Sequence, residues 1–505
     1  MFRALRDLPF VVLLIGLSGG AMLLPALHAV ASGDEATSRS FFYAGLITLV
    51  VFAMLGTATS GVEIRRRARS HLITIGVFFT CIPVILAIPF AQSTPNTSFA
   101  NVYLDMVSAL TTTGLPVYEA QRLAPSVHLW RAEVAWLGGF FMWVVAVSVF
   151  APLNLGGFEV GSGNQVGQGA ALTMTQIHKI ADPAERLARF TLKLAPVYGG
   201  LTAALWLGLI LAGDTPFVAL CHAFSTLSTS GISPVGGLSG AGSGYAGEVM
   251  ILAFLVFALS RLTFSSDDRT DGIATLVRDP ELRLGLLLIA LLPVLLFLRH
   301  FVAAIEADEA VSFREGFLGF WGALFTTASF LTTTGFESAA FGAARTWSGL
   351  DTPGLILMGL AVFGGGVATT AGGVKLLRVY ALYKHGIREM EKLVQPSSVG
   401  GAGQVARRFR RQGAYVAWIF FMLFAISIAT VMAALSLFGA DFESALVLTI
   451  ATLSTTGPLV TSAADPIDLI SLGLGAKAIL ALAMTLGRLE TLALIALLNP
   501  DFWRA

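Results

Sequence analysis

Long apolar runs alternate with short polar segments along almost the whole chain. A membrane-spanning helix needs about 17–25 residues, and these runs reach that length once their flanks are included. Two further runs, 247–264 and 352–380, are interrupted by small or polar residues, so we expect about ten crossings in all. The eight uninterrupted runs are 8–31, 41–62, 72–90, 134–150, 194–211, 284–298, 415–437 and 470–498.

Basic residues gather on one side of this predicted topology. With the N-terminus in the cytoplasm, the basic clusters at 65–69, 378–392 and 407–411 lie inside, and few bases lie outside. This is the positive-inside bias. It holds only if four shorter apolar segments do not cross, and these are 103–110, 217–227, 317–331 and 442–453. Runs of about 10–14 residues favour re-entrant or buried helices, the alternative being helices on the outer membrane surface.

The same five-residue pattern follows each short segment: a leucine, a hydroxyl residue, a threonine, a hydroxyl residue and a glycine. One copy alone is only a helix end with small polar residues, but four copies roughly a hundred residues apart indicate internal repeats. We therefore predict an all-α polytopic membrane protein, in which four pseudo-symmetric membrane helix–pore helix–membrane helix repeats surround one pore. The copies are LTTTG at 110–114, LSTSG at 227–231, LTTTG at 331–335 and LSTTG at 453–457.

The repeats follow an additional N-terminal helix pair, which we place at residues 1–66. The predicted repeats occupy residues 67–155, 156–272, 273–395 and 396–505, and each contains one copy of the motif.

The four motifs have the chemistry of a cation-selective pore. Non-helical backbone at membrane depth survives only where it is buried in protein or lines a water-filled cavity, and four loops around one axis create such a cavity. Rings of carbonyl oxygens can replace the hydration shell of a potassium ion, and glycine permits the backbone angles this requires. The predicted ion-binding residues are Thr112, Thr113, Gly114, Thr229, Ser230, Gly231, Thr333, Thr334, Gly335, Thr455, Thr456 and Gly457.

The chain resembles the Trk/Ktr/HKT superfamily of potassium transporters, specifically its bacterial TrkH type. The resemblance rests on the four loops, the glycine-rich segment 364–375, and the ending 487–490 with Asn-Pro-Asp-Phe-Trp-Arg at 499–504. The resemblance covers nearly the whole chain. It implies a homodimer in the lipid of the bacterial inner membrane, with both termini cytoplasmic and one pore per protomer. It also implies regulation by a cytoplasmic, TrkA-type nucleotide-binding ring. Potassium is then the substrate, and the chain needs no cofactor.

The resemblance also assigns two elements that control the pore. One is an intramembrane gate below the filter, for which a kinked or broken helix that merely packs closely is the alternative. The other is Arg488, which by resemblance points into the pore, whereas a salt bridge with Glu490 or a place at the membrane interface is the alternative. An uncompensated charge inside a bilayer costs at least ~2.5–3.5 kcal/mol. The gate residues are Gly364, Gly365, Gly366, Thr369, Thr370, Gly372, Gly373 and Lys375.

The four motifs are not identical, so the symmetry of the pore is approximate. Ser228 and Ser230 stand in the second copy, and Pro458 follows the fourth glycine. In plant relatives a serine at the first filter glycine accompanies sodium transport, and glycine at all four positions here favours potassium.

Acidic residues on the outer side would concentrate cations at the mouth of the pore, the alternative being that these scattered acids are only solvated loop residues. Glu337 is the strongest candidate because it lies two positions past the third filter glycine. The others are Asp105, Glu119, Asp214, Glu306, Asp308, Glu309 and Asp441.

Composition narrows the possible classes of function. Charged residues make up 12% of the chain, against about 25% in soluble domains, and a net charge of +1 without a basic patch argues against a nucleic-acid partner. The two cysteines lack metal-ligand spacing, the seven histidines are scattered, and catalytic motifs are absent. A symporter coupled to protons or sodium remains the alternative within transport, and a polytopic membrane enzyme is the alternative from another class.

Overall fold

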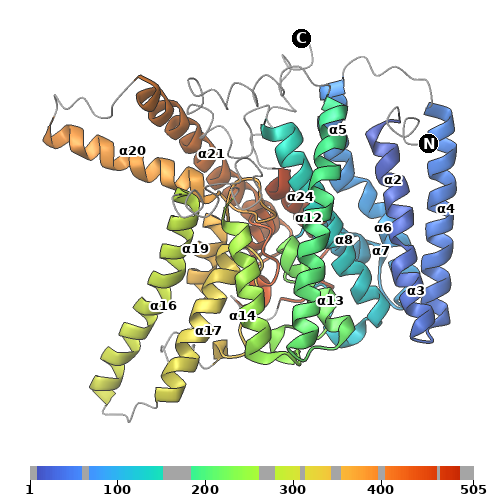
Figure 1. Cartoon of the computed structure of the whole chain (residues 1–505), viewed down its shortest axis with the longest axis horizontal. Helices are drawn as coiled ribbons and strands as arrows, with labels where there is room; N and C mark the ends of the chain where they lie inside the picture. Colours follow the sequence, from blue (N-terminus) through green and yellow to red (C-terminus); the bar gives the residue numbers. More distant parts are fainter. Residues whose placement is uncertain are drawn as a thin grey trace.

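The computed structural model describes residues 8–59, 67–151, 183–260, 279–307, 313–342, 354–395, 404–462 and 467–489. Within these ranges the regular structure is entirely helical, which confirms the predicted all-α class. Most helices stand side by side as a bundle, while α20 projects from it (Figure 1). Among the described residues, six stretches are long and apolar enough to cross a membrane: Phe10–Ala31, Glu35–Thr59, Thr74–Ser93, Pro125–Phe150, Arg186–Leu211 and Gly413–Leu437.

The first half of the chain contains the N-terminal helices and two motif-bearing units. The N-terminal helices are α2 (Phe10–Ala21), α3 (Leu23–Ala31) and α4 (Glu35–Thr59). The first unit contains α5 (Arg67–Thr80), α6 (Ile82–Ser93), α7 (Phe99–Leu110) and α8 (Pro125–Val145). The second contains α12 (Pro183–Leu211), α13 (Pro216–Ser228) and α14 (Gly244–Leu255).

The second half of the chain contains two further motif-bearing units, the third and the fourth. The third unit contains α16 (Pro280–Ala307), α17 (Phe313–Leu331), α19 (Gly354–Phe363) and α20 (Leu376–Val394). The last unit contains α21 (Gln404–Leu437), α22 (Phe442–Leu453), α23 (Leu459–Ser462) and α24 (Leu474–Leu489). The predicted ending at 499–504 and Glu490 lie outside the described residues, and the run predicted at 470–498 is described as a helix only over α24.

The four short segments form helices that end at the predicted motifs. Three begin at a side-chain cap, in which Ser98, Thr215 and Asp441 accept hydrogen bonds from backbone N–H groups of the first turn. Most residues of α7, α13 and α22 are buried within the protein, so the alternative of helices on the membrane surface is wrong for these three. α17 has 19 residues and is longer than predicted.

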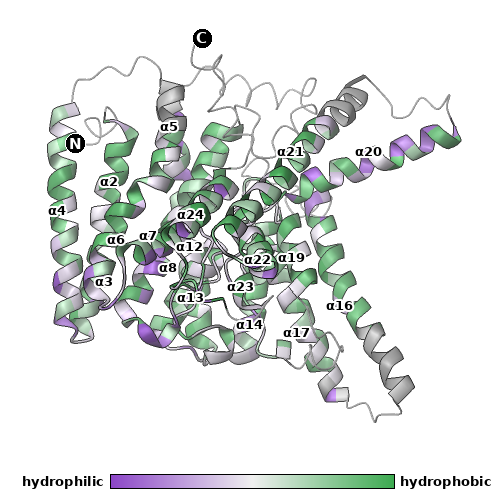
Figure 2. Cartoon of the chain, turned by 180° about the vertical axis from the view of Figure 1, so that it is seen from behind, coloured by the Kyte–Doolittle hydropathy of each residue, from purple (hydrophilic) through white to green (hydrophobic). Residues whose placement is uncertain are grey.

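Two long runs are less regular than their hydropathy predicts. The run at 72–90 divides into α5 and α6 at Cys81, next to Pro83, which cannot donate a backbone hydrogen bond. Residues 364–375 between α19 and α20 are not helical. Beyond this break α20 carries many polar residues, seen as purple bands in Figure 2, whereas most neighbouring helices are largely green, the colour of apolar residues.

Candidate functional site

Each short helix ends with a threonine in the left-handed backbone region. The third residue of each motif has a φ between 54° and 58°, and the next N–H bonds back to the carbonyl five positions earlier. Glycine usually occupies this position of a helix end. A β-branched residue there is strained by about 1–3 kcal/mol, and such strain clusters at functional sites. The residues are Thr112, Thr229, Thr333 and Thr455.

The first three loops contact one another through their glycines. A Cβ added to Gly114 would lie 1.7 Å from the carbonyl oxygen of Ser230 in the second loop. One added to Gly231 would lie 2.1 Å from the carbonyl oxygen of Thr334 in the third loop. Both contacts are with backbone atoms, so no side chain could be accommodated at either glycine.

The fourth loop closes the ring. A Cβ on Gly335 would meet Pro458 Cγ at 2.9 Å, which joins the third loop to the fourth. The N–H of Gly457 donates a 2.6 Å hydrogen bond to the carbonyl oxygen of Thr113, which joins the fourth loop to the first. The contacts therefore run from loop one to two, three, four and back to one, so the four loops surround a common axis.

The fourth loop also departs from the others in its backbone. Gly114, Gly231 and Gly335 have φ values of 69°, 66° and 80°, whereas Gly457 has no left-handed φ. Pro458 follows it, and proline restricts the conformation of the residue before it. The ring is therefore only approximately fourfold, as the sequence predicts.

Paired hydroxyls hold the side chains of each loop. The second and fourth residues of every motif lie within hydrogen-bonding distance: Thr111 and Thr113 at 2.8 Å, Ser228 and Ser230 at 3.0 Å, Thr332 and Thr334 at 3.2 Å, and Ser454 and Thr456 at 3.2 Å. The bond explains why both positions carry hydroxyl groups. In the first and fourth loops, the buried Oγ1 atoms of Thr112 and Thr455 have no hydrogen-bond partner among the described residues.

Segment 364–375 lies directly against the ring. The N–H of Gly372 donates to Thr333 Oγ1 at 2.8 Å, and a Cβ on Gly372 would lie 2.2 Å from the Thr455 hydroxyl. Thr370 Oγ1 donates to the carbonyl oxygen of Leu227 at 3.2 Å. The segment thus touches the second, third and fourth loops, and its non-helical backbone fits both a gate and a broken helix that merely packs closely.

Both predicted basic residues lie at this segment. Lys375 is buried, has a φ of 75°, and donates through Nζ to the carbonyl oxygen of Ala371. Arg488, on α24, is 3% exposed and donates through Nη1 to the carbonyl oxygen of Thr370 at 2.5 Å. Its burial excludes a position at the membrane interface.

A cavity of about 840 Å³ is lined by Gly114, Gly231 and Gly335 of the first three loops and by Pro458 of the fourth. Its acidic lining residues are Glu119, Glu337 and Asp468, and Arg122 and Arg131 also reach it. The structure thus brings Glu119 and Glu337 together as predicted, and adds Asp468, which no sequence pattern singles out.

Two predicted mouth acids are instead buried. Asp105 forms an ion pair with Arg131 at 2.7 Å, and Asp214 lies 3.8 Å from His222. Burial raises the pKa of Asp214, but the nearby His222 imidazole and the hydrogen bond from the Ser243 N–H outweigh it and lower the pKa overall. Their assignment to an acidic mouth of the pore is therefore wrong, because the surrounding protein buries them. Asp441 is an exposed helix cap, whereas the Glu306 side chain, Asp308 and Glu309 lie outside the described residues.

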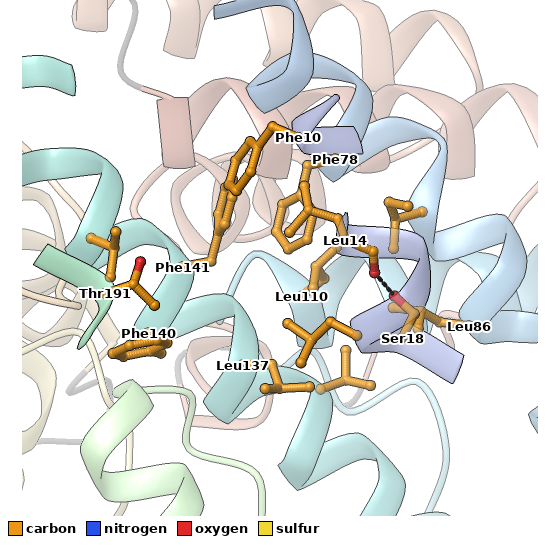
Figure 3. A pocket seen from close by; sticks show the side chains of 14 residues that line it. Phe10, Leu14, Ser18, Phe78, Leu86, Leu110, Leu137, Phe140, Phe141 and Thr191 are labelled. Atoms are coloured by element: carbon orange, nitrogen blue, oxygen red, sulfur yellow. Dashed lines mark hydrogen bonds between the residues drawn. The ribbon is translucent and has the colours of Figure 1, made fainter. Parts of the chain in front are cut away.

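A second cavity of about 110 Å³ lies behind the first loop and is lined by residues of α2, α5, α6, α7, α8 and α12 (Figure 3). Phe10, Phe78 and Phe141 line it, together with Leu110 of the first motif. The Ser18 hydroxyl faces it but donates to the carbonyl oxygen of Leu14 at 2.9 Å (Figure 3). Apolar cavities of this kind stay dry, so this one offers no path for an ion.

Sequence reasoning missed Glu248 on α14. It is 2% exposed and bonds to the segment that follows the third loop. A lone carboxylate inside the apolar run 247–264 was the available signal, since ionisable residues in membrane segments are usually functional.

The chain is similar in sequence and fold to known transport proteins. The profile of the TrkH family, described as "Cation transport protein", matches residues 248–502. The Trk system potassium uptake protein TrkH of Vibrio parahaemolyticus is 29% identical over 500 residues, covering 98% of both chains. Its namesake from Escherichia coli K12 is 29% identical over 507 residues, covering 100% of this chain and 99% of that one. The crystal structure of the potassium transporter TrkH from Vibrio parahaemolyticus matches with a TM-score of 0.79 and 27% identity over 100% of both chains.

Proposed function

This chain belongs to the TrkH family of cation transport proteins, and from that premise we propose that it takes up potassium through a channel-like pore filtered by the ring of four loops. The observation that carries the proposal is the closed contact order of the loops, each with a strained threonine at the same position. Relatives named potassium uptake proteins support potassium as the ion. The membrane-enzyme alternative is set aside because the family is one of transporters.

The proposed filter consists of the last three residues of each motif. Their carbonyl oxygens replace the water around a dehydrated potassium ion and, being uncharged, release it again. The hydroxyl pairs keep the fourth side chain of each motif bonded within its own loop. Thr112 and Thr455 have hydroxyl oxygens without partners, which makes them additional candidates for contact with the ion.

Segment 364–375 is the proposed gate. Its contacts with three of the four loops support this role, because it cannot leave its place without exposing the end of the ring. Arg488 donates to Thr370 of this segment, so its positive charge lies where a leaving cation would pass. Repulsion between the two charges would slow conduction.

We also propose a location and partners for the protein. We place the protein in the bacterial inner membrane, with both termini cytoplasmic, because basic clusters then lie inside. The relatives are named as members of a Trk system, which supports further components, and we expect a homodimer under a TrkA-type cytoplasmic ring.

Flux through the purified protein in liposomes tests the function. Potassium and rubidium should pass down their own gradients without a sodium or proton gradient, and sodium should pass more slowly. Strict dependence on either gradient would favour the symporter instead.

A further inference from the structure

The carboxylate of Glu248 is bonded by three donors from the third motif-bearing unit. Oε2 accepts from Trp321 Nε1 at 2.6 Å and from Ser338 Oγ at 2.7 Å, and Oε1 accepts from the N–H of Ala339 at 2.7 Å. These distances are typical of strong, charge-assisted hydrogen bonds. Because Glu248 is 2% exposed, water cannot substitute for these partners.

These bonds cross from one repeat to the next. Glu248 lies on α14 of the second unit, whereas Trp321 lies on α17, the helix that leads to the third loop. Ser338 and Ala339 follow the filter glycine Gly335 by three and four residues. One carboxylate thus joins the segments before and after the third filter to the second repeat.

A displacement at Ser338 would reach the filter directly. Phe336, the residue after Gly335, is buried and packs edge-on against His222 of α13, with ring centroids 5.7 Å apart. The chain between Gly335 and Ser338 is therefore held at both ends. If Glu248 released its end, Gly335 could shift against Pro458, its neighbour in the ring.

The first two loops are also held by polar contacts just past their motif glycines, but the groups that make these contacts differ. Arg131, paired with Asp105, donates to the carbonyl oxygen of Leu115, one residue past the first filter glycine, at 3.3 Å. In the second loop, His222 Nε2 lies 2.9 Å from the hydroxyl of Ser233, two residues past the glycine. Each of these three loops thus has a polar contact just past its glycine that holds the chain in place.

We propose that Glu248 is a positioning residue that determines ion specificity, by holding the third loop at the spacing that favours potassium over sodium. The inference rests on the proposed function, since it assumes that the loops are the filter. Glu248 itself need not touch the ion.

The substitution Glu248→Gln tests this with little change of shape. Each carboxylate oxygen faces an obligate N–H donor, from Trp321 on one side and Ala339 on the other. The amide of glutamine must therefore turn its NH₂ group toward one of these donors. A mismatched buried donor is a substantial penalty, and we expect the potassium-to-sodium flux ratio in liposomes to fall about tenfold.

Trp321→Phe provides a rescue. It removes the donor facing Oε2, so in the double variant the glutamine NH₂ can point there and donate to the Ser338 hydroxyl, while its carbonyl accepts from Ala339. The flux ratio of the double variant should exceed that of Glu248→Gln alone. A general loss of folding would lower the amount of active protein and would not show this recovery.

Two controls separate the possible failures. Glu443→Gln removes an exposed carboxylate from α22 and should leave the flux ratio unchanged. Gly335→Ala alters the proposed filter itself. If Gly335→Ala lowers the ratio but Glu248→Gln does not, or if Trp321→Phe brings no recovery, the role of Glu248 is wrong. If neither variant lowers the ratio, the filter assignment fails.

Discussion

The N–H of Gly457 donates to the carbonyl oxygen of Thr113, and this 2.6 Å hydrogen bond joins the last motif of the chain to the first. More than three hundred residues separate the two loops. The bond completes the ring that the other three glycines make by close contact with the next loop. A single pore assembled from one chain needs such a closure, since the last repeat must return to the first.

Gly114→Ala should abolish selective transport. Its Cβ would lie 1.7 Å from the carbonyl oxygen of Ser230, and the residue has a left-handed φ of 69°. Because the added Cβ meets a backbone oxygen, the first two loops can accommodate it only by moving apart. Gly199→Ala on α12 is the matched control, because no atom lies within 4 Å of the added Cβ. Potassium uptake measured at equal amounts of membrane protein should be lost in the first variant and kept in the second. Equal uptake in both would contradict the contact.

Deletion of residues 367–373 should give a leaky pore. The segment contacts three of the four loops, and its removal takes away Thr370 and Gly372, which make those contacts. Potassium efflux from loaded liposomes should rise and should no longer respond to a regulatory partner. A pore that is simply closed would show that the segment supports the loops instead of blocking them.

Arg488→Ala should raise potassium conductance. The guanidinium is buried beside Thr370, and a positive charge there opposes a passing cation. Removing roughly 1.4 kcal/mol of repulsion corresponds to about a tenfold rise in rate. Arg488→Lys keeps the charge and should stay close to the original conductance in the same flux measurement. A fall with alanine and no loss with lysine would indicate a structural bond to the gate.

Asp105→Asn should destabilise the protein strongly. The Asp105–Arg131 pair is almost completely buried, and breaking such a pair leaves a charge without compensation, which costs about 3–5 kcal/mol. The exposed pair Glu35–Arg39 is the control, since Glu35→Gln should cost less than about 1 kcal/mol. Thermal unfolding in detergent compares the two. Similar midpoints would contradict a structural role for the buried pair.

The local features of this fold could be predicted from the sequence. The motifs identify the four loops, and the length of the apolar runs identifies the short helices. Both are visible in the sequence because the ends and the length of a helix are determined by residues close together along the chain. The left-handed threonines could not be predicted, since glycine is the residue that normally favours this conformation. The alternation of hydroxyls was visible, but its cause, the bond between second and fourth residues, was not.

Contacts between distant segments account for most of what the sequence did not reveal. Asp105 and Asp214 were predicted among the acids at the mouth of the pore because the sequence does not say which helix covers them. The partners of Glu248 lie 73 to 91 residues away, and nothing in their spacing connects them. The contact between Gly372 and Thr333 likewise follows only from the folded arrangement.

Ion selectivity of the Gly335→Ser variant is the most direct test of the ring as one filter. Potassium and sodium fluxes should be measured side by side in liposomes containing the original protein, the variant, or the control Gly199→Ala. The added side chain would press on Pro458 of the neighbouring loop from a residue whose φ is 80°. We expect a clear preference for potassium in the original protein and the control, and a loss of that preference in the variant. An unchanged preference in a variant that still conducts would contradict the filter.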